Sequence, residues 1–152
     1  MKYTTTGAAT AWDPIVSNNL STANAHVNAI VVSGSTIYLG GQFTGLNNPV
    51  IPRAALGAVN ATTGAATVWN PSVNDVVKAI VLDGATLYAS GEFTLTGFNG
   101  TTASPTTRNH VAAFDTTVST ITVLSRTGST ATATLSAPNT TLATGNYVTV
   151  QG

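Results

Sequence analysis

Carboxylates and histidines are the residues through which this chain could perform acid–base or metal chemistry, and it contains few of them. The acids are Asp13, Asp75, Asp83, Glu92 and Asp115, and the histidines are His26 and His110. Glycoside hydrolysis needs two carboxylates facing one sugar ring, and Glu92 with Asp115 is the one pair that could serve. Neither histidine has a carboxylate or a second histidine at ligand spacing. We therefore predict no catalytic residue, no metal site and no cofactor.

Trp12 and Trp69 are the residues best suited to contact a ligand, because an aromatic ring can stack on a sugar. They stand in similar surroundings, Trp12-Asp13-Pro14 and Trp69-Asn70-Pro71. A buried aromatic side chain also anchors one strand against the next sheet. Because the tryptophan recurs together with its flanking residues, packing is the favoured interpretation. Ligand stacking at Trp12 and Trp69 is the alternative.

Composition excludes several classes of partner. Only 7% of the 152 residues are charged, with five basic and five acidic side chains, against about 25% in an ordinary soluble protein. A nucleic-acid surface or an anionic membrane would need clustered basic residues. The chain has no cysteine, which excludes disulfides and thiolate metal sites. We expect no nucleic acid and no membrane among its partners.

Three ordered blocks of sequence occur twice, which indicates an internal repeat. Residues 27–44 match residues 77–94 at a spacing of 50, and both copies end in Tyr-x-x-Gly-x-Phe-Thr. Residues 6–14 match residues 63–71 at a spacing of 57. Residues 53–60 match residues 108–115. We call residues at matching places in the two copies repeat-equivalent.

Each block is typical of β-structure. Two β-branched and aromatic segments flank Ser33-Gly34-Ser35, which predicts a hairpin. The second copy has Asp83-Gly84 there, a dipeptide favoured in turns whose central residues have positive φ. A further turn at residues 62–64 leads into the strand before Trp69. Each repeat therefore predicts four strands in about fifty residues, and no segment has the apolar spacing of a helix.

The repeat also predicts which side chains pack and which tie the units together. The aromatic residues of the motif are expected in the core, namely Tyr38, Phe43, Tyr88 and Phe93. The repeat-equivalent pair Arg53 and Arg108 is expected to bond backbone carbonyls of a loop or a neighbouring unit.

We therefore expect an all-β protein: two propeller-type, four-stranded blade repeats in residues 1–117, followed by a small β-hairpin module in residues 118–152. The blocks begin with a closing strand, so the terminal strands would pair across units. A propeller ring takes about four or more blades. Because two blades cannot close a ring, we expect copies to assemble, for example three chains around a six-bladed ring.

Residues 37–43, 53–60 and 63–71 resemble the delta-60 type β-propeller repeat of large bacterial surface proteins and many phage proteins. The resemblance covers roughly residues 3–117. It implies a propeller-type fold and little about activity. The sequence Ala89-Ser90-Gly91 departs from the family pattern, which favours Gly-Gly.

The tail has a different pattern. Residues 120–124 and 131–135 alternate around a turn at residues 126–129, and segments 137–140 and 144–150 follow. This order resembles a small β module common in phage tail and other virion proteins. Asn139-Thr140-Thr141 stands where that module carries His-Gly, and Asn146 stands where it carries Asp. Such a module normally continues into further strands, so a truncated module is one interpretation of residues 118–152.

The two resemblances and the Thr-, Ser- and Asn-rich composition predict a non-enzymatic structural protein of a phage or phage-like particle, located in the virion or outside the cell. It would be a tail, fibre or capsid-decorating component. The expected partners are other copies of the chain, other virion subunits and host-surface glycans. One alternative is a glycan-binding bacterial surface or secreted adhesin module that uses Trp12 and Trp69. The other is a carbohydrate-active propeller enzyme that uses Glu92.

Overall fold

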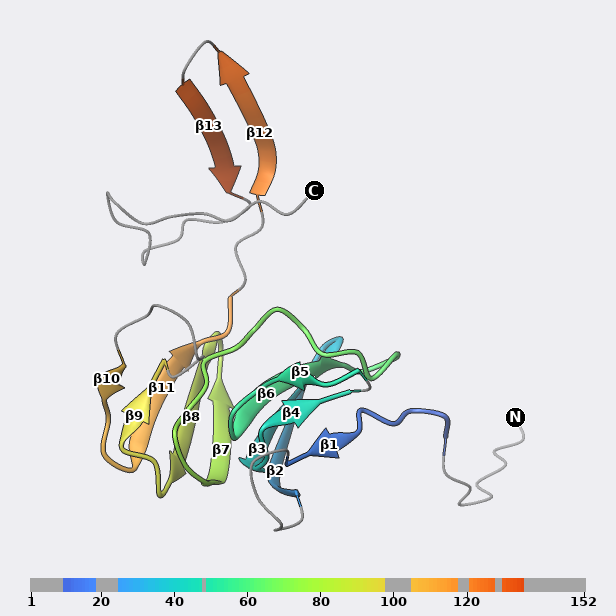
Figure 1. The fold of residues 1–152 in the computed structure, drawn as a ribbon, viewed down its shortest axis with the longest axis vertical. Coiled ribbons are helices and arrows are strands. Elements are labelled where there is room, and N and C mark those ends of the chain that lie inside the picture. The colour runs from blue at the N-terminus through green and yellow to red at the C-terminus, as the bar shows by residue number, and fades with distance from the viewer. Residues whose placement is uncertain are drawn as a thin grey trace. The chain divides into compact units, whose positions relative to one another are not determined.

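The computed structural model of the chain describes residues 10–18, 25–47, 49–97, 105–117, 121–127 and 130–135. The chain divides into two compact units, Met1–Thr116 and Thr117–Gly152. The described residues form thirteen strands and no helix, so the all-β prediction is confirmed (Figure 1). In this described part there is accordingly no helix of the length and apolarity needed to cross a membrane.

Two three-stranded antiparallel sheets form the body of the first unit (Figure 1). The first repeat sheet has the order β2-β3-β6, from His26–Ser33, Thr36–Gln42 and Leu56–Asn60. The second repeat sheet has the order β7-β8-β11, from Val77–Asp83, Thr86–Gly91 and Val111–Asp115. The two sheets share one register: Tyr38 lies opposite Val31 and Ala58, and Tyr88 lies opposite Val81 and Ala113.

In the described residues each repeat sheet has three strands, whereas a complete blade repeat was predicted to have four. The predicted fourth strand, residues 65–69, meets β6 through a single bridge between Val59 and Ala66. Two backbone bonds flank this bridge, from Asn60 N to Ala65 O and from Thr67 N to Ala58 O, each 2.8 Å long. The first-copy block begins at residues 6–9, which lie outside the described residues.

Short strands that the sequence pattern did not predict complete each repeat. In the first, β1 (Val16–Ser17), β4 (Gly45–Leu46) and β5 (Ile51–Pro52) form a sheet of order β1-β4-β5. In the second, β9 (Leu95–Thr96) pairs with β10 (Thr106–Thr107), and Val73 bridges to Thr96 as Val16 pairs with Leu46. These two-residue pieces are too short to show a periodic apolar pattern.

Both predicted hairpin turns are present, with the turn one residue later than expected in the second copy. Ser33 pairs with Thr36 and Asp83 pairs with Thr86, so the loops are Gly34-Ser35 and Gly84-Ala85. Only the glycine has positive φ, +56° in each loop. This is the glycine-first type of two-residue turn, whose twist suits a hairpin. Asp83 is therefore the last residue of β7 and not a central turn residue.

The glycine of the Tyr-x-x-Gly-x-Phe-Thr motif has a steric cause. A bulge between residues 27 and 29, and its counterpart between residues 77 and 79, brings a carbonyl close to the neighbouring strand. A Cβ on Gly41 would lie 2.0 Å from the oxygen of His26, and one on Gly91 would lie 2.0 Å from the oxygen of Val76. No side chain fits at either place, so the motif requires glycine there.

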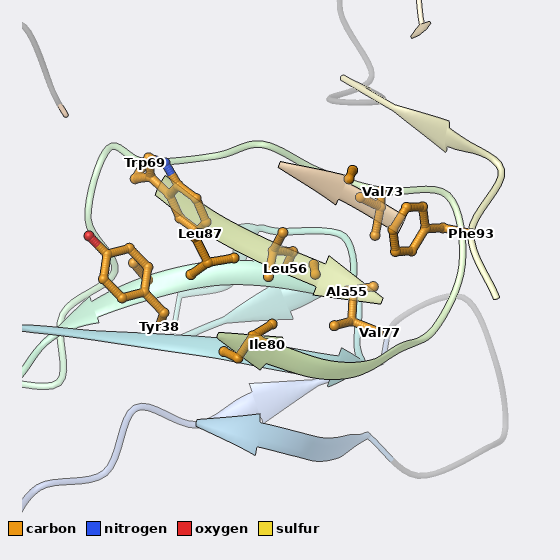
Figure 2. Packing of buried hydrophobic residues seen from close by; sticks show 12 residues of the cluster. Tyr38, Ala55, Leu56, Trp69, Val73, Val77, Ile80, Leu87 and Phe93 are labelled. Carbon is orange, nitrogen blue, oxygen red and sulfur yellow. The ribbon is translucent and has the colours of Figure 1, made fainter. Parts of the chain in front are cut away.

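The main core lies between the two repeat sheets, where one face of the first packs on one face of the second (Figure 2). We call this contact the inner junction. Leu56, Ile80 and Leu87 lie at its centre, with Tyr38 and Trp69 toward one end and Val73 and Phe93 toward the other (Figure 2). The sheets approach closely at one glycine: a Cβ on Gly40 would lie 2.6 Å from Cγ1 of Val77.

The aromatic core prediction is confirmed for three of its four residues. Tyr38, Phe43 and Phe93 are buried, with Phe93 fully enclosed. Tyr88 is 46% exposed, so the prediction is wrong there. Its repeat-equivalent Tyr38 is covered by the second sheet, and no described element of the first unit covers Tyr88.

The second unit contains one described antiparallel hairpin, β12 (Ile121–Thr127) with β13 (Thr130–Leu135). The predicted hairpin is confirmed, but its strands run further than expected. Arg126 and Thr127 pair with Ala131 and Thr130 and are not turn residues. The segments at residues 137–140 and 144–150, which carry the resemblance to a virion module, lie outside the described residues.

We expect Gly40→Ala to destabilise the fold by about 1–3 kcal/mol, because overpacking a closed core strains it. The new Cβ would lie 2.6 Å from Cγ1 of Val77 and 3.1 Å from Cγ2 of Ile80. Urea denaturation followed by circular dichroism measures the free energy of unfolding. The matched control is Ser90→Ala, at the repeat-equivalent position, which should change it by less than about 0.5 kcal/mol. Equal losses in the two variants would contradict the close approach at Gly40.

Candidate functional site

Glu92 lies in an exposed ion pair. Its Oε1 is 2.6 Å from Nζ of Lys78, and both side chains are largely exposed. The hydrogen bond from Lys78, together with the charge of Lys78, lowers the pKa of Glu92 below its usual value. A general acid in glycoside hydrolysis needs the opposite, a raised pKa that keeps the carboxyl group protonated.

The structure does not bring Glu92 and Asp115 together. Asp115 pairs with Thr86 at the start of β8, whereas Glu92 follows Gly91 at its end. Along a strand this places their backbones about 20 Å apart. The two carboxylates of a glycosidase stand about 5–10 Å apart. The arrangement therefore does not provide the carboxylate pair that an enzyme of this class would need.

The histidines and the other acids lie in loops or at the ends of strands. His110 has φ of +68°, and its repeat-equivalent Ala55 has φ of +56°. Each accepts a bond from a motif glycine, Gly91 N to His110 O and Gly41 N to Ala55 O, both 2.9 Å. His26 is exposed at the start of β2. Asp13 and Asp75 accept bonds from nearby backbone amides. Among the residues that the structure describes, no three His, Asp or Glu side chains form a metal cluster.

Trp69 lies inside the inner junction. It is 8% exposed, and its ring meets Tyr38 edge-on at a centroid distance of 5.0 Å and an angle of 85°. Phe114 meets it from the second sheet at 6.5 Å. The indole Nε1 donates to the carbonyl of Asp115 over 2.7 Å. These contacts support the packing interpretation, and ligand stacking at Trp69 stays a prediction.

Trp12 has the same attachment but less cover. Its Nε1 donates to the carbonyl of Asn60 over 3.1 Å, and Asn60 is the repeat-equivalent of Asp115. The ring is partly buried against a second core cluster that includes Leu39 and Val59. No aromatic partner of Trp12 occurs among the described residues, whereas Trp69 has two. Ligand stacking at Trp12 stays a prediction as well.

Arg53 performs the tying role expected from the sequence. Its guanidinium donates to the carbonyl of Pro52 over 2.7 Å and to the carbonyl of Thr67. The second bond holds residues 65–67 beside β6. Burial lowers the pKa of Arg53 from its usual value. Arg108 is exposed and donates to the carbonyl of Thr107.

One side of the second repeat sheet is an exposed apolar surface, which we call the outer face. It carries Ala79, Val81, Tyr88, Val111 and Ala113. Val81 is 62% exposed and Val111 is 61% exposed. A shallow groove of about 120 Å³ runs over this face. The sequence does not predict the outer face. It is distinguished only by a difference in exposure between repeat-equivalent residues, and exposure cannot be read from a sequence.

A second hollow of about 180 Å³ lies at one end of the inner junction. Its floor includes Phe43 and Val73, and its rim includes Asn74 and Asp75. The rim groups already have structural roles: Oδ1 of Asn74 accepts from the amides of Thr94 and Leu95, and Oδ1 of Asp75 accepts from the amide of Val76. The outer face is therefore the stronger candidate for function.

We expect Trp69→Ala to lower the free energy of unfolding by about 3–5 kcal/mol, as for a buried aromatic residue. Trp12→Ala should cost clearly less, because part of that ring already contacts water. Urea denaturation of both variants beside the wild type measures the two losses. Losses of the same size would contradict the greater burial of the Trp69 ring compared with the Trp12 ring.

We expect Glu92→Gln to change the melting temperature only slightly at neutral pH, because an exposed ion pair contributes little. The folded pKa of Glu92 is lowered, so its stabilisation is present above the unfolded pKa and lost as pH falls through the folded pKa. The difference between wild type and variant should therefore shrink as the pH falls below the usual pKa of a glutamate. Thermal melts across this range measure it, and a difference that grows in acid would contradict the sign.

Comparison with known protein families, with curated proteins and with solved structures finds no match for this chain.

Proposed function

We propose that this chain is a non-enzymatic structural protein that works by assembling with further subunits, and that its two repeat sheets are propeller-type units of that assembly. The outer face of the second repeat sheet carries this proposal. Tyr88 and Val81 stand exposed there, while their repeat-equivalents Tyr38 and Val31 pack against the main core. Fully burying such a side chain contributes about 1.5–3 kcal/mol. A face that is buried in one copy of a repeat and bare in the other is a natural docking surface.

The number of repeats supports the same conclusion. Two repeat sheets do not close a ring, which takes about four or more units. The outer strands of the two sheets are edge strands, and an edge strand can pair with a strand of a neighbouring chain. Three chains would supply six sheets, enough for a ring of ordinary size.

A phage or phage-like particle is the setting that we propose, as a tail, fibre or capsid-decorating component in the virion or outside the cell. Its support is the resemblance of the repeats and of the tail to proteins frequent in such particles. The low charge and the absence of cysteine fit a protein held by sheet packing and subunit contacts. Other copies of the chain and other virion subunits are then its partners. Tail and capsid genes beside its own gene would support this setting, and genes of an unrelated pathway would oppose it.

A second candidate is a glycan-binding surface module, and the exposed part of the Trp12 ring favours it. The ring contacts Leu39 and Val59 on the protein side and retains accessible surface. A glycan array would show binding that is lost in Trp12→Ala. If the wild type binds no glycan, or if Trp12→Ala binds as well as the wild type, this candidate fails.

We expect the wild type to self-associate at tens of micromolar and Val81→Lys to remain a monomer, because a charge on the outer face would have to be buried on docking. Native mass spectrometry and light scattering over a concentration series measure the subunit number. Val68→Lys is the matched control, since Val68 is 76% exposed and lies off the outer face. A folded wild-type monomer at every concentration would contradict the proposed function.

A further inference from the structure

We propose that copies of this chain join head to tail: the outer face of one copy docks on the first repeat sheet of the next, in the way the two sheets meet at the inner junction. This inference rests on the proposed function and names the partner and the polarity of the assembly. The receiving surface carries Ile30 and Val32 of β2, and we call it the open face.

In three repeat-equivalent pairs, the exposed fraction follows the position of the residue in the stack and not the residue type. On the side of each sheet that faces the next, Tyr38 is 6% exposed against 46% for Tyr88, and Leu56 is 0% exposed against 61% for Val111. On the opposite side, Ile80 is 7% exposed against 58% for Ile30. In each pair, the buried member faces the inner junction and the exposed member faces away from it. On its open face, the first repeat sheet therefore lacks the covering sheet that it provides for the second. The outer face of another copy can supply that cover.

The hydrogen bonds and ring contacts of the two tryptophans also fit head-to-tail docking. Trp69 is bonded to the carbonyl of Asp115 at the second sheet and receives Tyr38 from the first, ring edge to ring face. Trp12 is bonded to the repeat-equivalent carbonyl, that of Asn60, and has no such partner among the described residues. In a head-to-tail pair, Tyr88 of one copy therefore meets Trp12 of the next.

The two repeat-equivalent arginines indicate the same head-to-tail order of the chains. Arg53 donates to the carbonyl of Thr67 and holds the segment before Trp69 on the edge of β6. Arg108 occupies the repeat-equivalent place beside β11, the edge strand of its sheet. Thr10 is the repeat-equivalent of Thr67, and it is exposed. Arg108 of one copy then reaches the carbonyl of Thr10 in the next, as Arg53 reaches Thr67 within one chain.

Two differences between the repeats make the junction between two chains wider than the inner junction. Gly40 leaves no room for a Cβ against Val77, yet its repeat-equivalent is Ser90. Asn28 donates from Nδ2 to the carbonyl of Val77 across the inner junction, and its repeat-equivalent is Lys78, a longer donor. The contact is heterologous, with two different surfaces, so it generates a closed ring or an open filament according to the rotation at each step.

A mixing experiment tests the polarity. Val81→Lys blocks the outer face and Ile30→Lys blocks the open face, and both positions are exposed in the monomer, 62% and 58%. We expect each variant alone to be a monomer and an equal mixture to give a dimer and nothing larger, by native mass spectrometry. The wild type and the control Val68→Lys should form larger species under the same conditions.

The other outcomes separate the two proposals. If either variant alone dimerises as well as the wild type, or if the mixture stays monomeric while the wild type assembles, head-to-tail docking is wrong and self-assembly stands. If the wild type itself is a monomer, the proposed function fails with it. Circular dichroism melts establish that each variant is folded, and Val81→Thr with Ile30→Thr repeat the test without added charge.

Ser90→Gly provides a test by gain of association. It removes the side chain that the inner junction excludes at Gly40, so we expect the dissociation constant between copies to fall about tenfold. Sedimentation of wild type and variant over a dilution series measures this constant. An unchanged or raised constant would show that the outer face does not use the geometry of the inner junction.

Discussion

The close packing of the first repeat sheet on the second is the constraint on which the rest of the first unit depends. A three-stranded sheet needs a cover for its apolar face, and here each sheet provides part of the cover for the other. Gly40 allows the approach, since any Cβ there would strike Val77. Trp69 then closes one end of the contact by meeting Tyr38 and Phe114 from the two sheets. The exposure of Ile30, Val81, Tyr88 and Val111 follows from which sides of the two sheets this contact covers.

The two repeats agree more closely in backbone conformation than in residue type. Asn47 and Gly97 each donate to two carbonyls, those of residues 14 and 15 in one case and 71 and 72 in the other. Both have positive φ, as do Ile15 and Ser72 at the accepting ends. Positive φ is costly for a β-branched residue such as Ile15. Such a conformation is held by the surrounding hydrogen bonds, so the sequence at these places could change while the fold did not.

Sequence reasoning succeeded where structure is local and failed where it is not. The hairpins around Gly34 and Gly84 follow from alternation and turn residues, and the equivalence of Trp12 and Trp69 follows from the repeat. The two-residue strands β1, β4 and β9 did not follow, because distant segments hold them in place. The equal burial expected for Tyr38 and Tyr88 failed for a similar reason: the two residues occupy matching positions, but only Tyr38 has a sheet in front of it. A sequence repeat specifies each unit and leaves open what lies beyond the last one.

The differences between the two repeats suit the docking that we propose, in which the outer face contacts water until a second chain covers it. At the inner junction, Gly40 and Asn28 fit a contact that forms within one chain. The same places near the outer face hold Ser90 and Lys78, and Lys78 is paired with Glu92 at its rim. Polar and charged residues at the rim of an exposed sheet limit indiscriminate pairing with other edges. They leave Tyr88, Val81 and Val111 bare at the centre, where specific contact would bury the most apolar area.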